Sequence, residues 1–409
     1  MKKADLLREE LKARGGLLRF APCWVGRTFM QPGRRLKLDP RDYYAYGGAK
    51  GGINERWFAS TTPADNAEFT VPNEGLSFVV IKHGESFEQI LFREAVELAG
   101  GDILGEAMMN AYGGWRMYAK FFDNMGPIAH HVHLKDEHAA KVGMLGKPEG
   151  YYFPRQQNNV DNNFPHTYFG LNPGTTKDQV MECLRNWDKG DNRILDLSRA
   201  YRLEPGTGWD VPPGVLHAPG SLLTYEPQRA SDVSALFQPL VEGRYNPRSW
   251  LEKDIPAEHY HDYEYYIDLL DWEKNVDPDF KKNRHLTPVP SADPAKTADE
   301  GFWENWVVYG SREYCAKELT VLPGRRVTLR DSGPYGFITM QGHGTVNGNR
   351  IESPTMIRFG QLTCDEMFVT CDAAEQGVVI ENISECDDLV LLKHFGPGNP
   401  DAAHLVKTK

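Results

Sequence analysis

The sequence predicts a mainly β protein in which two β-sandwich domains carry helical insertions. From Phe302 onward, short runs of strand length are separated by turns rich in Gly, Pro and Asn, a rhythm typical of sandwiches. Further upstream, an apolar run from Trp115 to Phe122 precedes two histidines that stand two residues apart, His131 and His133. On a strand, residues at this spacing point to the same face. Together these patterns predict sheets that bring side chains to a shared site.

The composition indicates a globular protein that neither binds nucleic acid nor enters a membrane. Its 409 residues suffice for two or three domains with their own cores. A formal net charge of −11 disfavours a nucleic-acid partner, because phosphate backbones require a basic surface. No apolar run approaches the roughly 18 residues that span a bilayer, and the charged segment 1–15 lacks the apolar core of a secretory signal. The six cysteines show no CxxC spacing, which favours reduced thiols in the cytoplasm. We expect a monomer or a homodimer.

The first domain is expected over residues 1–245, with a helical segment at about 86–114. Ser86-Phe87-Glu88-Gln89 has the form of a capping box, in which two side chains satisfy the first backbone N–H groups of a helix. The pair Gly100-Gly101 is expected to end that helix. A second capping box, Thr176-Lys177-Asp178-Gln179, predicts a short helix that ends at Gly190. Its apolar stripe is expected to pack in the core and comprises Val180, Cys183, Leu184 and Trp187.

Three histidines predict a metal site. His131 and His133 share one face of a strand, and the segment from Gly206 to His217 has the glycines and prolines of a tight turn that leads into a neighbouring strand. Three imidazoles and a carboxylate form a site for one divalent metal. His259 and His261 have the same spacing, but their segment is patterned as a helix, where residues two apart do not face each other. We therefore expect this second pair at the surface.

The remainder of the chain predicts a connection and a smaller sandwich. Residues 246–298 are expected to connect the domains, with a helix at 257–274 and a Pro-rich linker at 286–296. Residues 299–409 are expected to form the second domain, with strands at 306–309, 326–329, 335–340 and 377–381 and a hairpin at 342–349. Because this part has no His-x-His pair, we expect it to be structural.

The two histidine segments resemble the motifs of the cupin superfamily. The second fits the pattern G-x5-P-x-G-x2-H-x3-N through Gly206, Pro212, Gly214 and His217, with Ser221 where Asn is usual. Residues 126–143 are a looser version of the other cupin motif. Within the cupins the chain looks most like a type I mannose-6-phosphate isomerase, whose Q-V-H-P-D-D-E-Y-A and K-P-E stretches correspond to residues 131–139 and 147–149. The resemblance implies a bicupin fold with a degenerate second cupin domain, and one zinc ion per chain, with Mn, Fe or Co as alternatives.

The resemblance also implies which residues form the site. The metal ligands would be His131, His133, Glu149 and His217. The general cupin pattern would instead select Glu137 as the carboxylate, but we prefer Glu149 because the isomerase-like match extends further along the chain. The candidates for proton transfer are Lys147, Glu226 and Asp232, and the residues expected to help shape the substrate pocket are Trp24 and Glu55.

Three departures from the isomerase pattern affect the expected substrate. His131 replaces a glutamine, Pro219 replaces a tyrosine, and Leu236 stands where the family carries an arginine thought to act in catalysis. Leucine cannot replace a buried cation, so either another residue such as Arg229 binds the substrate in its place or the substrate differs. The sequence leaves open whether the sugar is phosphorylated.

We expect a metal-dependent isomerase that interconverts an aldose and a ketose through an enediolate, acting on a small sugar or sugar phosphate. Two other functions stay open. One is a cupin oxygenase that uses Fe or Mn at the same ligands, and the other is a sugar-binding bicupin without catalytic activity.

Overall fold

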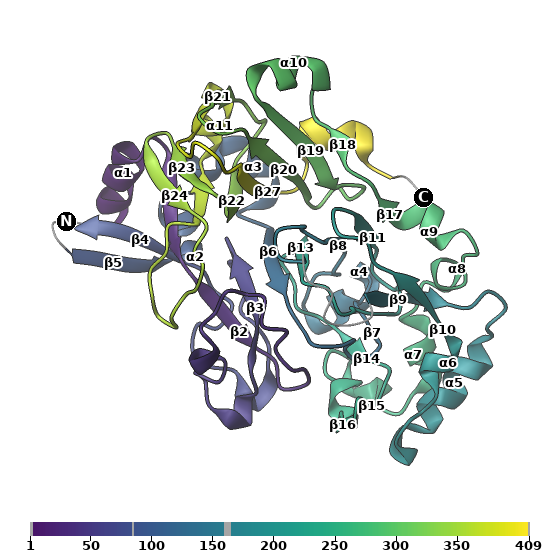
Figure 1. Cartoon of the computed structure of the whole chain (residues 1–409). Coiled ribbons are helices and arrows are strands. Elements are labelled where there is room, and N and C mark those ends of the chain that lie inside the picture. Colours follow the sequence, from purple (N-terminus) through teal and green to yellow (C-terminus); the bar gives the residue numbers. More distant parts are fainter. Residues whose placement is uncertain (1–2, 84–85, 159–164, 408–409) are drawn as a thin grey trace.

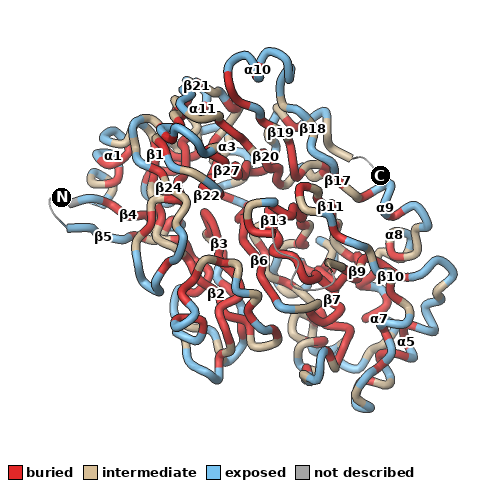
Figure 2. The backbone as a smooth tube through the Cα atoms, in the orientation of Figure 1, coloured by how far each residue is buried: buried red, intermediate tan, exposed pale blue. Residues whose placement is uncertain are grey.

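The fold is mainly β, as the sequence predicts, and its sheets are stacked in layers (Figure 1). The computed structural model describes residues 3–83, 86–158 and 165–407. The layers are, in order, a four-stranded sheet, a nine-stranded sheet, a seven-stranded sheet, a five-stranded sheet and a group of helices. Buried residues follow the strands through the middle of the molecule (Figure 2), so an apolar core joins each layer to the next.

The nine-stranded sheet joins the two ends of the chain. Its strand order is β18-β19-β20-β27-β22-β25-β1-β4-β5. Strand β1 (Leu17–Ala21) pairs with β25 (Glu366–Val369) on one side and with β4 (Phe78–His83) on the other. The remaining strands are β5 (Ser86–Leu91), β18 (Val289–Pro290), β19 (Phe302–Val308), β20 (Cys315–Val321), β22 (Tyr335–Gln341) and β27 (Leu389–Phe395).

The sheet pairing does not follow the domain boundaries expected from the sequence. Strand β1 lies in the segment 1–245, yet it is an inner strand of the sheet that the C-terminal residues build. Both of its faces are buried, with Leu17 in the core of the C-terminal sandwich and Leu18 and Phe20 in the core that joins the two halves. A strand buried on both faces is stable only between two neighbours, which the C-terminal part provides.

The four-stranded sheet completes the C-terminal sandwich. Its order is β21-β26-β23-β24, and its strands are β21 (Arg326–Leu329), β23 (His343–Val346), β24 (Asn349–Glu352) and β26 (Val378–Asn382). The predicted hairpin is confirmed, since β23 and β24 pair across Asn347 and Gly348. Both turn residues have positive φ, 45° and 74°, as a two-residue turn of the I′ type requires.

A closed group of four buried charges lies in this C-terminal sandwich. Glu304 and Asp331 each contact both Lys317 and Lys393, at distances between 2.5 and 3.0 Å. Burial opposes the charge of Glu304, but Lys393 and Lys317 outweigh it and lower the pKa of Glu304 from 4.5 to about 2. Because each charge has two partners of opposite sign, the group can be buried without a metal ion.

Replacing Glu304 by glutamine is expected to lower the melting temperature by about 5 °C at pH 7, because one carboxylate then faces two buried ammonium groups. The difference from the wild type should shrink as the pH falls from about 5 towards 2. A depressed folded-state pKa adds stability above the unfolded-state pKa, and this stability is lost as the group protonates. Melting curves over this pH range test the prediction. Glu300→Gln, at an exposed position, is the control. An equal change in melting temperature in both variants would contradict the prediction.

The other two large sheets form the N-terminal sandwich. Their orders are β17-β11-β8-β13-β6-β3-β2 and β10-β9-β12-β7-β14. The seven-stranded sheet contains β2 (Cys23–Gly26), β3 (Ile53–Phe58), β6 (Met117–Phe122), β8 (Glu149–Tyr152), β11 (Gly208–Val211), β13 (Thr224–Arg229) and β17 (His285–Leu286). The five-stranded sheet contains β7 (His131–Val132), β9 (His166–Leu171), β10 (Ser198–Arg202), β12 (His217–Ala218) and β14 (Ala235–Leu236). A small hairpin of β15 (Leu240–Val241) and β16 (Arg244–Tyr245) follows. Tyr151, Phe169 and Trp209 belong to an aromatic core between the two large sheets.

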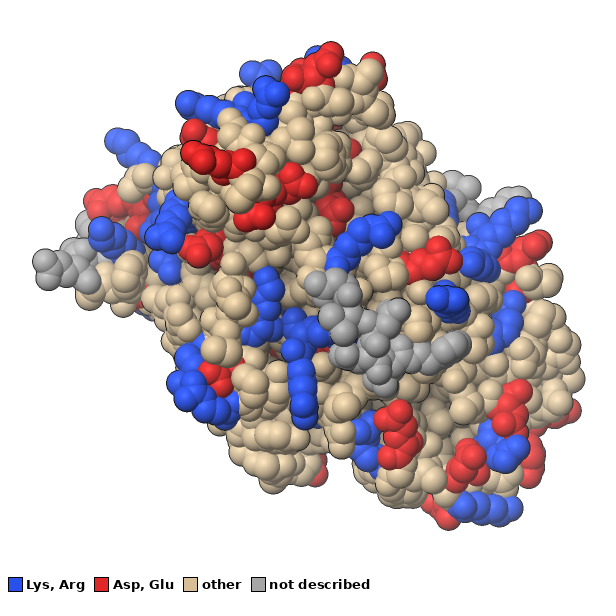
Figure 3. Space-filling view, in the orientation of Figure 1, with Lys and Arg blue, Asp and Glu red and all other residues tan. Residues whose placement is uncertain are grey.

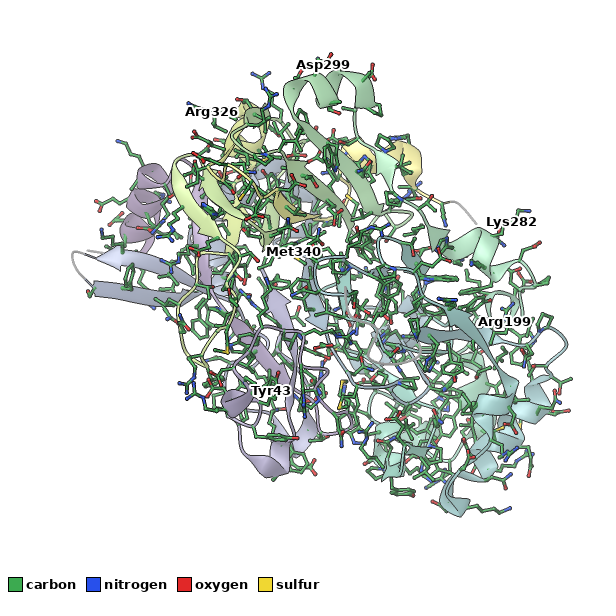
Figure 4. The ribbon with its side chains drawn as sticks, in the orientation of Figure 1. Tyr43, Arg199, Lys282, Asp299, Arg326 and Met340 are labelled. Atoms are coloured by element: carbon green, nitrogen blue, oxygen red, sulfur yellow. The ribbon has the colours of Figure 1, made fainter. Side chains whose placement is uncertain are left out.

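The seven-stranded and nine-stranded sheets share an apolar core that joins the two halves. Met340 of β22 is 3% exposed within it. Figure 4 shows Met340 near the middle of the molecule, whereas Arg199 and Lys282 lie at the outer edge of the N-terminal sandwich. At this junction the hydroxyl of Tyr225 on β13 lies 2.9 Å from Nδ1 of His394 on β27.

The first predicted capping box is wrong. Ser86–Leu91 forms strand β5 and pairs along β4, and helix α2 (Phe92–Leu104) begins only after it. The helix also continues through Gly100 and Gly101, with a kink at Ala99. Pairing with β4 satisfies the backbone groups that the expected cap would have satisfied, so a tertiary contact overrides the local pattern. Helices α1 (Lys3–Ala13) and α3 (Glu106–Tyr112) lie on either side of this segment in the sequence.

The second capping box is confirmed at the start of α5 (Lys177–Arg185). Thr176 accepts from the backbone N–H of Gln179, and the Gln179 side chain accepts from the backbone of Thr176. The predicted stripe is buried against the five-stranded sheet together with α7 (Tyr263–Asp268). The helix expected at 257–274 is instead broken into short pieces, because Asp262 and Asp271 each cap a new start, of α7 and of α8 (Trp272–Asn275). The remaining helices are α4 (Asp136–Ala139), α6 (Ile194–Leu197), α9 (Phe280–Arg284), α10 (Pro294–Glu300) and α11 (Cys371–Gln376).

Charged side chains of both signs are spread over the surface. Figure 3 shows acidic and basic side chains interspersed over one face. Within the described residues, no helix has both the length and the apolar character needed to span a membrane. None of the six cysteines forms a disulfide. The side chains of His259 and His261 are 32% and 69% exposed, so this pair lies at the surface as predicted.

Candidate metal centre

Three histidines converge from two neighbouring strands. His131 on β7 and His217 on β12 are direct partners in the antiparallel ladder, and His133 follows two residues after His131. One ligand atom of each lies within 4.8 Å of the others. All three side chains are buried. The spacing of two along one strand and the register between two strands therefore place three imidazoles around one point.

The backbone fixes which ring nitrogen faces that point. Nδ1 of His131, His133 and His217 lies 2.7 to 2.9 Å from the carbonyl oxygen of Ala129, Val233 and Val215 respectively. A carbonyl only accepts, so each Nδ1 must donate. In a neutral imidazole this leaves Nε2 with its lone pair directed to the centre, which is the form that binds a metal.

Burial keeps the imidazoles of His131 and His133 neutral. It lowers the pKa of His133 to about 4 and the pKa of His131 well below its usual range, in the latter case with help from His217 and His133. Both rings are therefore uncharged at neutral pH and available as ligands without loss of a proton.

Glu149 on β8 completes the donor set from the facing sheet. Its Oε2 lies 2.9 Å from Nε2 of His133, and its Oε1 lies 3.0 Å from Nε2 of His217. Lone pairs thus face lone pairs, and both Glu149 Oε2 and His217 Nε2 are buried without a hydrogen-bond partner in the described part of the chain. Such an arrangement is costly unless a cation lies between the atoms. Three imidazoles and one carboxylate fit a divalent metal ion.

The alternative carboxylate lies elsewhere. The side chain of Glu137 on α4 is 63% exposed and pairs with Lys135 at 3.0 Å. Glu149 in contrast is oriented by the hydroxyl of Tyr151, which donates to its Oε1 at 2.7 Å.

Replacing Glu149 by glutamine is expected to weaken metal binding at least 100-fold, because a neutral amide replaces an anionic ligand. Glu137→Gln is the matched control, since it removes the same charge from the other cupin candidate, and it should leave the affinity unchanged. Competition for the metal against a chromophoric chelator measures both. A loss of affinity in Glu137→Gln alone would reverse the assignment.

A row of charged side chains crosses the seven-stranded sheet beside Glu149. Lys120 on β6 is directly opposite Glu226 on β13. Its Nζ lies 3.4 Å from Glu226 Oε2 and 3.6 Å from Glu55 Oε1 on β3. Burial lowers the pKa of Lys120, but Glu226 and Glu55 outweigh it, so the pKa is raised. Burial and the neighbouring Glu149 both raise the pKa of Glu226 well above its usual range. The row therefore combines a fixed positive charge with a carboxyl group that favours the protonated form.

Lys147 and Asp232 form a second pair next to the donor set. Lys147 Nζ lies 3.7 Å from Glu149 Oε2 and 3.8 Å from Asp232 Oδ1. Burial lowers the pKa of Lys147, with a contribution from Lys120. Burial opposes ionisation of Asp232, but Arg27 and Lys147 outweigh it and hold the pKa of Asp232 below its usual range. Both pKa values are lowered, and perturbed pKa values of buried groups in one cavity are typical of sites that move protons.

All of these groups line or adjoin one cavity between the two sheets of the N-terminal sandwich. It holds about 590 Å³ of empty space, its open mouth included. His131, His133 and Glu149 line it together with Lys147, Glu226 and Asp232. The rest of the lining combines the charged residues Arg27, Glu55, Asp65, Lys120 and Lys253 with apolar side chains, among them Phe29, Met30, Phe122, Ile128, Leu236 and Trp250. A cavity that combines an apolar wall with convergent polar groups suits a small organic ligand.

Two residues expected at the substrate pocket are not among its lining residues. Trp24 is 4% exposed in the core of the molecule, with the guanidinium of Arg56 5.5 Å from its ring. Arg229 ends β13 and pairs with Asp136 at 2.7 Å and with Glu313 at 3.2 Å. Arg229 lies only three residues after Glu226, an odd spacing that turns its side chain to the other face of the sheet. Glu55, in contrast, does line the cavity.

The buried arginine of the cavity is Arg27, which the sequence analysis missed. It follows β2, is 5% exposed, and pairs with both Glu55 and Asp232. Lys120 and Lys253 were missed as well and also line the cavity. The sequence signal for Arg27 is faint: a single charged residue directly after the apolar run Cys23–Gly26. Its partners lie 28 and 205 residues away, so local pattern does not reveal them.

Comparison with known proteins shows a likeness in fold. The sequence matches no protein-family model and no curated protein. A mannose 6-phosphate isomerase from Bacillus subtilis is 16% identical, with a TM-score of 0.59 over 93% of this chain and 99% of that one. A variant of phosphomannose isomerase from Salmonella typhimurium is 10% identical, with a TM-score of 0.60 over 93% and 100%. A mannose 6-phosphate isomerase bound with zinc and yttrium is 11% identical, with a TM-score of 0.59 over 93% and 100%. At these identities the chain shares the fold of the phosphomannose isomerases over nearly its whole length.

Proposed function

We propose that this chain, which has the fold of the phosphomannose isomerases, is a metal-dependent isomerase that interconverts an aldose and a ketose. The observation that carries the proposal is the sharing of one cavity by a metal donor set and by side chains able to carry protons. The substrate is a small sugar or sugar phosphate. The likeness in fold to the mannose 6-phosphate isomerases supports this class of reaction.

His131, His133, His217 and Glu149 would hold the metal, and zinc suits this donor set, with Mn, Fe or Co as alternatives. A bound divalent cation supplies Lewis-acid stabilisation of negative charge on the sugar oxygens. The Nδ1 hydrogen bonds to the backbone hold the three rings in place before any ligand arrives.

The isomerisation moves one proton between C1 and C2 and another between O1 and O2. It therefore needs groups that accept a proton and return it to the neighbouring atom. Lys147 is assigned the transfer between carbons, because its ammonium lies against both Glu149 and Asp232 and its pKa is lowered by burial. Asp232 keeps the Lys147 side chain in position. Glu226 is assigned the transfer between oxygens, with Lys120 3.4 Å away to balance its charge when the proton leaves.

The decisive experiment incubates the metal-loaded protein in D₂O with free and phosphorylated aldoses and ketoses. Loss of the C2 proton signal and appearance of the partner sugar are followed by NMR. We expect exchange and interconversion with at least one aldose–ketose pair, and elemental analysis should give about one metal ion per chain. No exchange with any pair, or oxygen consumption in its place, would overturn the isomerase assignment.

A further inference from the structure

The cations of the cavity determine what kind of sugar it can accept. A phosphate monoester carries roughly −1.5 to −2 charges near pH 7, and burying it requires cationic groups with unused N–H donors. Four described lysines and arginines line the cavity: Arg27, Lys120, Lys147 and Lys253. Their existing partners decide whether any of them is available.

Arg27 has no donor left for a ligand. Its guanidinium has five N–H groups, and five acceptors lie at 3.0 to 3.3 Å from its nitrogens. They are one oxygen of Glu55, both oxygens of Asp232, the side-chain oxygen of Asn66 and the backbone oxygen of Asp65. Arg27 therefore holds the cavity wall together and does not present a free edge to a phosphate.

The N–H groups of Lys253 also have partners already. Its three N–H groups face the backbone oxygen of Asp232 at 3.2 Å, the carboxylate of Asp254 at 3.1 Å and the carboxylate of Asp65 at 3.1 Å. The side chains of Lys253 and Asp254 are 11% and 14% exposed, so turning the ammonium towards a ligand would break a largely buried ion pair, which is destabilising.

Lys120 and Lys147 have looser contacts, at 3.4 to 3.8 Å, but they lie beside the donor set. Each is placed between two carboxylates of the inner cavity. A phosphate that reached them would occupy the space of the reacting carbons. Neither lysine can therefore bind a phosphate at the far end of a sugar whose first two carbons lie at the metal centre.

The apolar part of the cavity lining offers a place for that far end. Phe29 and Trp250 meet edge to face with ring centroids 5.4 Å apart, and Leu236 and Ile128 continue this wall. Aromatic faces pack well against the C–H groups of a neutral sugar, whereas a dianion there would lose its hydration without compensation.

From this arrangement we infer that the substrate is an uncharged, unphosphorylated sugar, with its distal carbons against Phe29 and Trp250. The inference rests on the proposed isomerase function for the position of the reacting carbons. It narrows the proposed substrate from a sugar or sugar phosphate to an unphosphorylated sugar, although the chain shares its fold with mannose 6-phosphate isomerases.

The test compares neutral sugars with their 6-phosphates on the metal-loaded wild type. D-mannose, D-glucose and D-fructose share one C1–C2 enediol, so they and their 6-phosphates form a matched set. We expect kcat/KM for the preferred neutral sugar to exceed that for its 6-phosphate at least 100-fold. Equal or faster turnover of the phosphate ester overturns the inference.

A variant at the partly buried Phe29 provides a second test. Phe29→Arg adds a cation to the apolar part of the lining, beside the Trp250 ring on which a guanidinium can stack. It is expected to raise kcat/KM for the 6-phosphate at least 10-fold. Phe29→Leu is the control. It should lower kcat/KM for the neutral sugar without raising kcat/KM for the 6-phosphate. No gain in Phe29→Arg, with folding and metal content intact, would count against the assignment of this wall.

Binding of hexitols separates this inference from the proposed function, since hexitols cannot isomerise. Calorimetry compares D-mannitol with mannitol 1-phosphate on the metal-loaded protein. Tighter binding of D-mannitol in a protein that exchanges no sugar proton would leave the substrate class standing and remove the isomerase function. Tighter binding of the phosphate, or binding of neither, would overturn the substrate class.

Discussion

Replacing His131 by alanine is expected to remove the bound metal and to lower isomerase turnover at least 1,000-fold. One of three imidazole donors is lost. The two remaining imidazoles and Glu149 supply fewer protein ligands than the full donor set, so the metal is held less tightly. Elemental analysis after dialysis measures the metal, and deuterium exchange measures the turnover. The loss of both together is the expected result.

The chain offers a matched control in its second His-x-His pair. His259→Ala removes a surface imidazole that stacks on Tyr265 and contacts Asp262, and it should leave both metal content and turnover unchanged. If His131→Ala still retained about one metal ion per chain, the donor set proposed here would be wrong. If it lost the metal but kept its turnover, the metal would not take part in the reaction.

Replacing Lys147 by methionine is expected to lower kcat about 100- to 10,000-fold while metal content and KM change little. Methionine keeps the length and apolar stem of the side chain but cannot carry a proton. The protein should remain folded, because Asp232 keeps its ion pair with Arg27 and methionine fits a 2% exposed position. Steady-state kinetics on the preferred sugar measure kcat and KM separately.

The control for Lys147 is Lys141→Met, which removes an amine 4.7 Å from the Tyr265 ring, outside the cavity. It should leave kcat unchanged. A Lys147→Met protein that binds metal and turns over at the wild-type rate would exclude Lys147 from the proton transfer and direct attention to Glu226. A large rise in KM with unchanged kcat would instead indicate that Lys147 only binds the sugar.

Expectations that rest on local spacing agree best with the structure. His131 and His133 face one point because alternate residues of a strand share a face, and the turn through Pro212 and Gly214 leads His217 to the neighbouring strand. The hairpin around Asn347 and Gly348 follows from turn chemistry in the same way. In each case the residues that determine the geometry are close together in the sequence.

The wrong expectations concern segments whose local pattern was outweighed by distant partners. Ser86 and Gln89 suit a helix cap, yet β4 offers their segment a strand to pair with. The buried arginine of the cavity is Arg27, because Glu55 and Asp232 converge on it from other strands and loops. Arg229 has the right charge, but its position on β13 turns it towards Asp136 and Glu313.

The sequence by itself determined the mainly β architecture and the convergence of three histidines, because both follow from the two-residue period of strands and from turn residues. Only the tertiary structure decided that β1 joins the C-terminal sheet, that Glu149 and not Glu137 meets the histidines, and that the cations of the cavity are already paired. Strand pairing and burial bring together residues that lie far apart along the chain, and the energy of a buried charge depends on those neighbours.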